Sequence, residues 1–112
     1  MSKNKAKGTR AESQVVEYLR SIWPHAERRA LTGAKDLGDV NPGNGTPCVV
    51  EVKDHQRLAL AEWMDELRQE MDNAGAPIGF LVVKRRGKGD PADWYWLCSG
   101  PVALDLLNEW GR

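Results

Sequence analysis

The segment that most constrains the fold is 77–83, which is apolar at almost every position. A strand that packs on one face alternates between apolar and polar side chains, whereas a strand with consecutive apolar side chains is buried on both faces. Ile78, Phe80 and Leu81 belong to such a consecutive run. We therefore expect 77–83 to lie inside a sheet that helices cover on both sides.

The rest of the chain supplies the other elements of an α/β domain. Apolar residues at helical spacing predict a helix over 10–22 and a second helix that Asp54 caps and Gly75 ends, and Pro101 opens a C-terminal helix. Strands are expected at 27–31, 37–40, 46–53, 77–83 and 94–98.

The resulting order is αβββαβ with a βα extension. It predicts a mixed central sheet flanked by helices, in which the first three strands form a meander. Residues 1–8 are interpreted as a flexible basic arm, and 9–112 as one domain.

Length and composition exclude several classes of protein. The chain has 112 residues, of which 41% are hydrophobic, and no apolar run approaches the ~20 residues of a membrane-spanning helix. The basic N-terminus has no apolar signal-peptide core, so we expect an intracellular, cytoplasmic protein. Cys48 and Cys98 have no partners at zinc-ligand spacing and are interpreted as small buried hydrophobes.

The net charge of zero is the sum of opposing segments. Residues 1–35 contain eight basic and three acidic side chains, and 84–88 contain four basic ones; in contrast, 54–72 contain six acidic and two basic ones. Such segregation allows one face to bind phosphates while another stays acidic. Ordinary solvated loops are the alternative explanation of the basic segments.

Two charged residues interrupt the most apolar part of the strand 46–53. Strand side chains alternate, so Glu51 and Lys53 project from one face, and Val50 and Val52 from the other. Burying a carboxylate and an ammonium here is costly, which favours a functional site. The alternative is a salt bridge at an exposed strand end.

Asp39 is expected to reach Glu51 across the turn at 41–45. Two converging carboxylates can hold a hard divalent cation, and Lys53 beside it could position or deprotonate water or neutralise charge on a phosphate. A local turn hydrogen bond is the alternative role of Asp39, and Asp36 replaces it as ligand if the strand register is shifted. Glu12 is a fourth candidate, with a capping box started by Thr9 as its other explanation.

These residues form a recognisable series. Lys7-Gly8-Thr9-Arg10-Ala11-Glu12 opens a helix, Gly38-Asp39-Val40 follows, and Val50-Glu51-Val52-Lys53 places its glutamate twelve residues after Asp39. The series resembles the PD-(D/E)xK nuclease superfamily, and within it the small Holliday junction resolvases of archaeal and phage type. Gly38 stands where that motif usually has Pro. The resemblance implies a restriction-endonuclease-like core.

The resemblance also implies roles for individual residues. Asp39, Glu51 and the backbone carbonyl of Val52 would bind Mg²⁺ or Mn²⁺, with Glu12 assisting, and Lys53 would be the catalytic lysine. Thr32 and Gln56 would lie near the scissile phosphate. Further DNA contacts are expected from basic residues in two groups: Lys7, Arg10, Arg28, Arg29 and Lys35, and then Lys84, Arg85, Arg86 and Lys88.

The implied function is a metal-dependent endonuclease for branched DNA that acts as a homodimer in recombination or repair. A restriction- or repair-type nuclease with the same site is the second hypothesis, and a non-catalytic nucleic-acid-binding module is the third. Trp94 and Trp96 on the last strand suit either an interface or the core. A lone His55 after the motif is interpreted as a surface or capping residue.

Overall fold

The computed structural model describes residues 3–29 and 36–112. It consists of three helices, five strands and one 3₁₀ turn within these residues. In chain order they are α1 (Lys3–Leu19), β1 (Glu27–Arg28), β2 (Val40–Asn41), β3 (Cys48–Lys53), α2 (Leu60–Ala74), β4 (Ile78–Val83), η1 (Pro91–Asp93), β5 (Tyr95–Leu97) and α3 (Gly100–Trp110).

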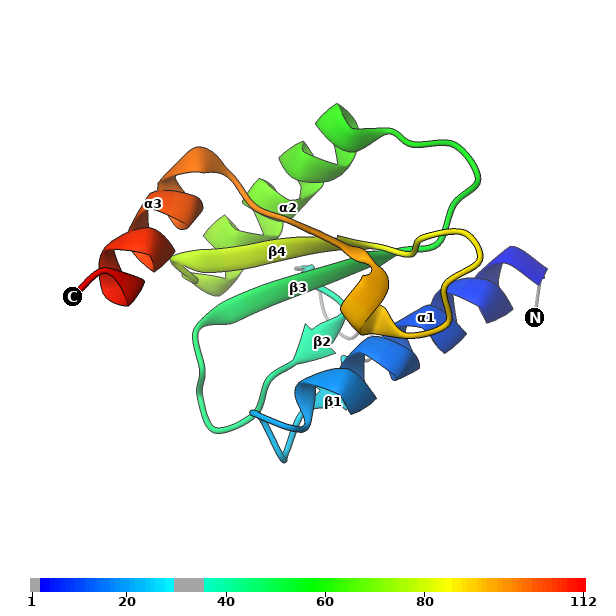
Figure 1. The fold of residues 1–112 in the computed structure, drawn as a ribbon, viewed down its shortest axis with the longest axis horizontal. Coiled ribbons are helices and arrows are strands. Elements are labelled where there is room, and N and C mark those ends of the chain that lie inside the picture. Colours follow the sequence, from blue (N-terminus) through cyan, green and yellow to red (C-terminus); the bar gives the residue numbers. More distant parts are fainter. Residues whose placement is uncertain (1–2, 30–35) are drawn as a thin grey trace.

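The strands form one mixed sheet in the order β1-β2-β3-β4-β5 (Figure 1). The first three are antiparallel neighbours, which confirms the predicted meander. α2 then carries the chain across to β4, which runs parallel to β3 with Glu51 opposite Leu81, and β5 returns antiparallel. The α/β class with a mixed sheet flanked by helices is as the sequence predicts.

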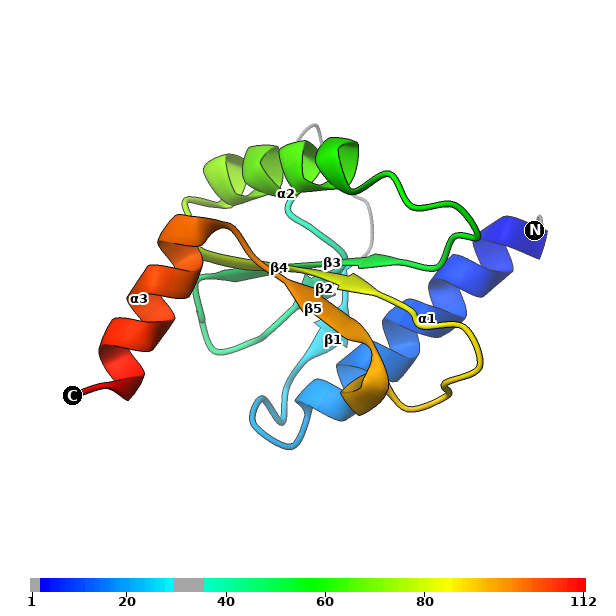
Figure 2. The same cartoon turned by 45° about the horizontal axis from the view of Figure 1, so that its top comes forward.

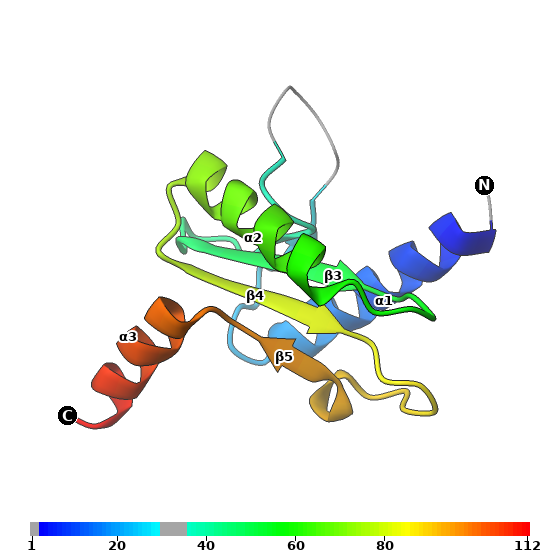
Figure 3. The same ribbon diagram turned by 90° about the horizontal axis from the view of Figure 1, so that it is seen from above.

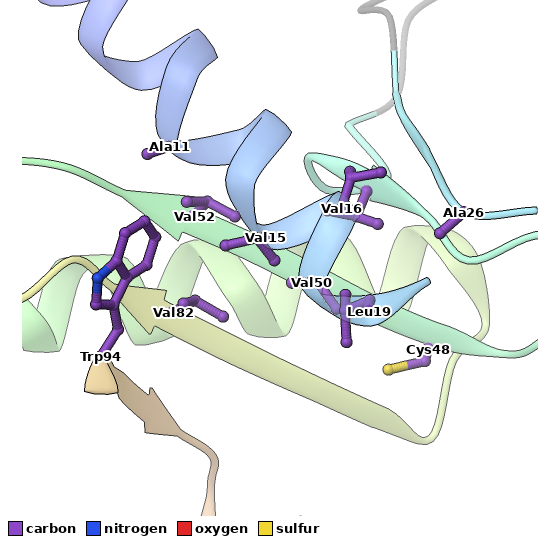
Figure 4. Close-up of a cluster of buried hydrophobic side chains, with 11 residues drawn as sticks. Ala11, Val15, Val16, Leu19, Ala26, Cys48, Val50, Val52, Val82 and Trp94 are labelled. Atoms are coloured by element: carbon purple, nitrogen blue, oxygen red, sulfur yellow. The ribbon is translucent and has the colours of Figure 1, made fainter. Parts of the chain in front are cut away.

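Helices cover the sheet on both faces, with α1 on one side and α2 on the other (Figures 2 and 3). On the α1 side, Val15 and Leu19 belong to a buried core with Val50 and Val52 (Figure 4). On the α2 side, a second core includes Trp63, Leu67, Val49, Leu81 and Val83.

The apolar strand β4 contributes to both of these cores. Leu81 and Val82 are fully buried, Leu81 in the α2-side core and Val82 in the α1-side core. This confirms the prediction that the segment 77–83 lies inside the sheet and is covered on both faces.

A glycine in β4 lets α2 approach the sheet closely. A Cβ atom at Gly79 would lie 2.8 Å from Cγ of Met71 and 3.3 Å from Cδ1 of Leu67, both on α2. Both separations are shorter than ordinary van der Waals contact, so a larger residue would require these side chains or the helix itself to move. The close packing matters for function because α2 also carries acidic side chains toward the end of β3.

The N-terminal segment differs from the prediction. α1 begins at Lys3, so residues 3–8 are helical and the interpretation of 1–8 as a flexible arm is wrong for them. Lysine and alanine are good helix formers, and Lys7 forms an ion pair with Asp54 (3.7 Å). Thr9 therefore lies inside the helix and cannot be its N-cap. This removes the capping box as the explanation of Glu12.

The start of α2 also differs, because Asp54 is not its cap. The helix begins at Leu60 after Ala59. Asp54 instead lies between Lys7 and Lys84, at 3.7 and 4.0 Å. The predicted end is confirmed, since Gly75 adopts a left-handed conformation (φ 62°) and its N–H donates to a carbonyl of the last turn.

The strand predicted at 37–40 is displaced toward the turn. β2 begins at Val40, and Gly38 before it has a positive φ of 94°, which is not a strand conformation. Asp39 therefore precedes β2. Its side chain approaches the end of β3 from this position, as described below.

The last strand and the cysteines fit a structural role. Trp94 is buried in the α1-side core, and Trp96 packs against the same core. Their indole N–H groups donate to the carbonyls of Lys88 and Pro91.

Cys48 is buried and Cys98 half-buried, and both are free thiols. None of the helices in the described part of the chain has the length and apolar character of a membrane span.

Candidate metal centre

A polar cleft of about 790 Å³ lies at the C-terminal end of β3, between α1, α2 and the segment that precedes β2. It brings together side chains that are far apart in the sequence. Four of them, Glu12, Asp39, Glu51 and Lys53, are the catalytic residues that the sequence predicts. The full lining consists of Lys7, Gly8, Glu12, Asp36, Asp39, Glu51, Val52, Lys53, Asp54, His55, Gln56 and Glu66.

Asp39 is held in the cleft by backbone geometry. Its N–H donates to the carbonyl of Val50 (2.9 Å), and its Oδ2 accepts the N–H of Val52 at 2.7 Å. The positive φ of the preceding Gly38 is one that a proline cannot adopt. A proline therefore cannot occupy position 38 in this backbone conformation.

Glu51 lies at the centre of the acidic side chains in the cleft and is only 5% exposed. It lines the cleft, whereas Val50 and Val52 lie in the α1-side core, so the predicted alternation is confirmed. Burial raises the pKa of Glu51 to about 8; Glu70 adds to the rise, while Asp39 and Lys53 oppose it.

Burial affects the pKa of Asp39 in the same direction as that of Glu51. Burial raises its pKa to about 8, and the neighbouring Glu51 contributes to the rise. The N–H of Val52 and the charge of Lys53 lower the pKa by less than burial and Glu51 raise it. Asp39 and Glu51 therefore lack enough positive charge nearby to keep both ionised at neutral pH.

Lys53 lies beside these acids and is already paired. Its Nζ donates to Oε2 of Glu66 at 2.9 Å and lies 4.0 Å from Oε2 of Glu51. Burial alone would lower the pKa of Lys53, but Glu66 and Glu51 outweigh burial and raise it. The lysine is therefore a cation at neutral pH. Of the roles that the sequence left open, this favours charge neutralisation over proton abstraction.

Glu12 reaches the cluster from α1. Burial raises its pKa, and the nearby charge of Asp39 raises it further, while Arg28 on β1 lowers it. Oε1 of Glu12 lies 3.4 Å from the Arg28 guanidinium. Arg28, predicted as a DNA contact, is exposed and forms an ion pair with Glu12 of the same chain.

Glu70 is, besides Glu66, a site residue that the sequence did not predict. It is 3% exposed, and its carboxylate lies within 4.8 Å of those of Asp36 and Glu51. Burial raises the pKa of Glu70 to about 7, and the charges of Asp36 and Asp39 add to the rise. Its position three residues after Leu67 on the buried stripe of α2 was the available signal. The sequence offered Asp36 only as a substitute for Asp39. In the structure both residues line the cleft, and Asp36 lies beside Glu51 and Glu70.

Carboxylate oxygens converging in this way fit a hard divalent cation such as Mg²⁺ or Mn²⁺. The donors come from α1, β3, α2 and the segment before β2, so the fold itself assembles them. A cation would compensate the negative charge that burial makes costly. The residues present therefore fit a metal ion by the chemistry of their donor atoms.

A smaller hollow of about 140 Å³ adjoins the acidic cleft. Lys7, Lys84 and Arg86 line it, and Asp54, His55 and Gln56 complete its wall. Lys7 and the last three residues also line the cleft, so the two spaces are direct neighbours. Basic groups thus lie directly beside the acids, in the arrangement expected of a site for a phosphate next to a metal.

His55 has a packing role at this border. Its ring lies against Trp63 of α2, with ring centroids 5.1 Å apart. The exposed position of His55 agrees with its interpretation as a surface residue.

The remaining predicted DNA contacts differ in their exposure and in their contacts within the protein. Arg10 is exposed on α1, and Arg85 stacks over Tyr95 at 5.9 Å. Arg29 is half-buried, and its backbone N–H donates to the carbonyl of Asp39. Thr32 and Lys35 lie outside the described residues.

Comparison of the chain with protein-family models, with curated proteins and with solved structures found no match. The geometry of the cleft and the resemblance of its motif are accordingly the basis for the function proposed below.

Proposed function

We propose that this protein is a metal-dependent endonuclease of the PD-(D/E)xK type that hydrolyses DNA phosphodiesters. The observation that carries the proposal is the convergence of Asp39, just before β2, with Glu51 and Lys53 of β3 in one cleft. The order αβββαβ supports a restriction-endonuclease-like core, because in such a core the motif lies on the same elements.

The acids would hold the metal ion. Asp39 and Glu51, with the backbone carbonyl of Val52, would bind Mg²⁺ or Mn²⁺, and Glu12 would assist from α1. When bound, such an ion polarises a phosphoryl oxygen and lowers the pKa of water. The protein contributes a cleft that keeps these oxygens in place before the substrate arrives.

Lys53 and the basic hollow would act on the phosphates. The Lys53 ammonium, held by Glu66, neutralises negative charge that develops on the scissile phosphate. Lys7, Lys84 and Arg86 bind a neighbouring phosphate and orient the DNA backbone toward the acids. The hydrolysis needs a water as nucleophile and leaves one product with a terminal phosphate and the other with a hydroxyl.

The preferred substrate is branched DNA, cut by a homodimer at two symmetric positions. Support for a second copy comes from α3, whose apolar side chains Leu104, Leu107 and Trp110 are exposed, Trp110 at 91%. Val102 is the buried residue of α3, and the helix extends away from the sheet (Figure 3). Pairing of two α3 helices would cover these side chains.

The test compares a four-way junction with a linear duplex of matched sequence, each incubated with the protein in Mg²⁺ and in EDTA. Mg²⁺-dependent cutting that prefers the junction is expected. Equal cutting of both substrates would refute the junction preference and leave a restriction- or repair-type nuclease. No cutting of either, in Mg²⁺ or Mn²⁺, would refute the nuclease itself.

The dimer has its own test. Sedimentation should give twice the monomer mass for the wild type, and Leu107→Glu together with Trp110→Glu should give the monomer. These residues are exposed, so the substitutions should leave the fold intact. A wild-type monomer at all concentrations would contradict the dimer without affecting the metal site.

A further inference from the structure

The acids around Glu51 fall into two groups. Asp39 and Glu12 lie on the side of β2 and α1, where both line the cleft and the charge of Asp39 acts on Glu12. Asp36 and Glu70 lie on the side of α2, where their carboxylates and that of Glu51 are all within 4.8 Å of one another. Glu51 therefore belongs to both groups.

Glu70 carries a feature that an ordinary acidic cluster lacks. Only 3% of the residue is exposed, and its Oε1 has no hydrogen-bond partner among the described residues. A buried carboxylate oxygen without a partner is costly, and a metal ion is one of the few groups that would compensate it. The carboxylate points into the cluster, not toward solvent.

The Lys53 ammonium, which also lies beside Glu51, is paired elsewhere. Nζ of Lys53 bonds Oε2 of Glu66 at 2.9 Å and lies 4.0 Å from Oε2 of Glu51. Asn73, one turn after Glu70 on α2, donates from Nδ2 to the carbonyl of Asp36 at 2.9 Å. α2 thus carries Glu70 and, through Asn73, holds the segment that carries Asp36.

We propose that Asp36, Glu51 and Glu70 form a second divalent-cation position, which shares Glu51 with the position formed by Asp39. Oxygen donors alone are the set that Mg²⁺ and Mn²⁺ prefer. The catalytic meaning of a second ion, which is to stabilise both the attacking and the leaving oxygen, rests on the proposed function. The binding of the ion does not rest on it.

The experiment is a calorimetric titration of the full chain with Mn²⁺ in the absence of DNA. The wild type should bind two ions, and Glu70→Gln should bind one, the other weakening at least about tenfold. Asp39→Asn should also retain one ion. Glu62→Gln, an exposed acid on the same helix, is the matched control and should bind two.

The stability of the variant separates a ligand from a structural residue. Glu70→Gln replaces a buried carboxylate, whose Oε1 has no hydrogen-bond partner among the described residues, with a neutral amide, so its melting temperature in EDTA should equal or exceed that of the wild type. Asp36→Asn, at an exposed position, repeats the test should Glu70→Gln fail to fold. The proposal would be overturned if the wild type bound fewer than two ions. It would also be overturned if Glu70→Gln and Asp36→Asn each bound two ions with unchanged affinity.

The outcome is independent of DNA cleavage. If the protein binds two Mn²⁺ ions but cuts no DNA, the second cation position is supported and the proposed function is refuted. If the protein cuts DNA with a single bound ion, only the second position is refuted.

Discussion

The two faces of β3 differ although they are formed by the same six residues. Toward α1 the strand presents Cys48, Val50 and Val52, all buried in an apolar core. Toward α2 it presents Val49 and then two charged residues, Glu51 and Lys53, at the cleft. The first face stabilises the fold, whereas the second carries charge at a cost to stability. A strand can thus support chemistry on one face because the other anchors it.

The largest expected effect comes from the charged face. Glu51→Gln should lower DNA cleavage at least about 100-fold, because the shared metal ligand is lost. It should leave the protein folded, since a buried charge is replaced by a neutral side chain of the same shape. The measurement is a cleavage time course on the junction in Mg²⁺, with circular dichroism as the check on folding. Loss of folding in step with activity would contradict the division between the faces.

The apolar face should respond in the opposite way. Val50→Ala removes a side chain that is 1% exposed and should lower the free energy of unfolding by about 2 kcal/mol. Cleavage per folded molecule should stay close to that of the wild type. Urea unfolding measures the first quantity, and cleavage below the unfolding transition measures the second. Equal stability of Val50→Ala and the wild type would refute the anchoring role.

The acids of the charged face should make stability depend on pH. In the fold, the pKa values of Asp39 and Glu51 are raised to about 8 and that of Glu70 to about 7, against about 4 in the unfolded chain. Their contribution to stability is fully present below about pH 4 and is lost as pH rises toward 7 to 8. The melting temperature in EDTA should therefore fall between pH 5 and 8.

Metal should reverse that loss. At pH 8, millimolar Mg²⁺ should raise the melting temperature by several degrees, and the rise should be smaller at pH 5. Glu51→Gln, measured in parallel, should show a shallower fall with pH and a smaller effect of Mg²⁺. A melting temperature that is constant or increases from pH 5 to 8 in EDTA would count against the raised pKa values.

The smallest effect concerns the basic hollow beside the charged face. Lys84→Gln with Arg86→Gln should weaken DNA binding and lower the slope of log affinity against log salt by about 2. Arg68→Gln, at an exposed position on α2 that does not line the hollow and is not among the expected DNA contacts, is the control. Fluorescence anisotropy over a range of salt concentrations measures both. Identical slopes for the double variant and the control would remove the hollow from the binding surface.

The two faces of β3 could be predicted because period-two alternation is a local property of the sequence, and β4 could be predicted because its run of consecutive apolar side chains is also local. The meeting of Asp39 and Glu51 could also be predicted, since a short turn joins their segments. Glu70 and Glu66 could not, because acids on an amphipathic helix usually face solvent, and their place in the site depends on how α2 packs on the sheet. The pairing of Asp54 with two lysines likewise depends on tertiary contacts.

The most direct test of the metal-dependent site is a crystal structure of the Lys53→Ala variant with junction DNA and Mn²⁺, in which anomalous scattering locates the ions. We expect an ion bound by Asp39 and Glu51, with a DNA phosphate oxygen as a further ligand and a second phosphate near Lys84 and Arg86. DNA bound elsewhere on the protein, with no ion in the cleft, would contradict the proposed function.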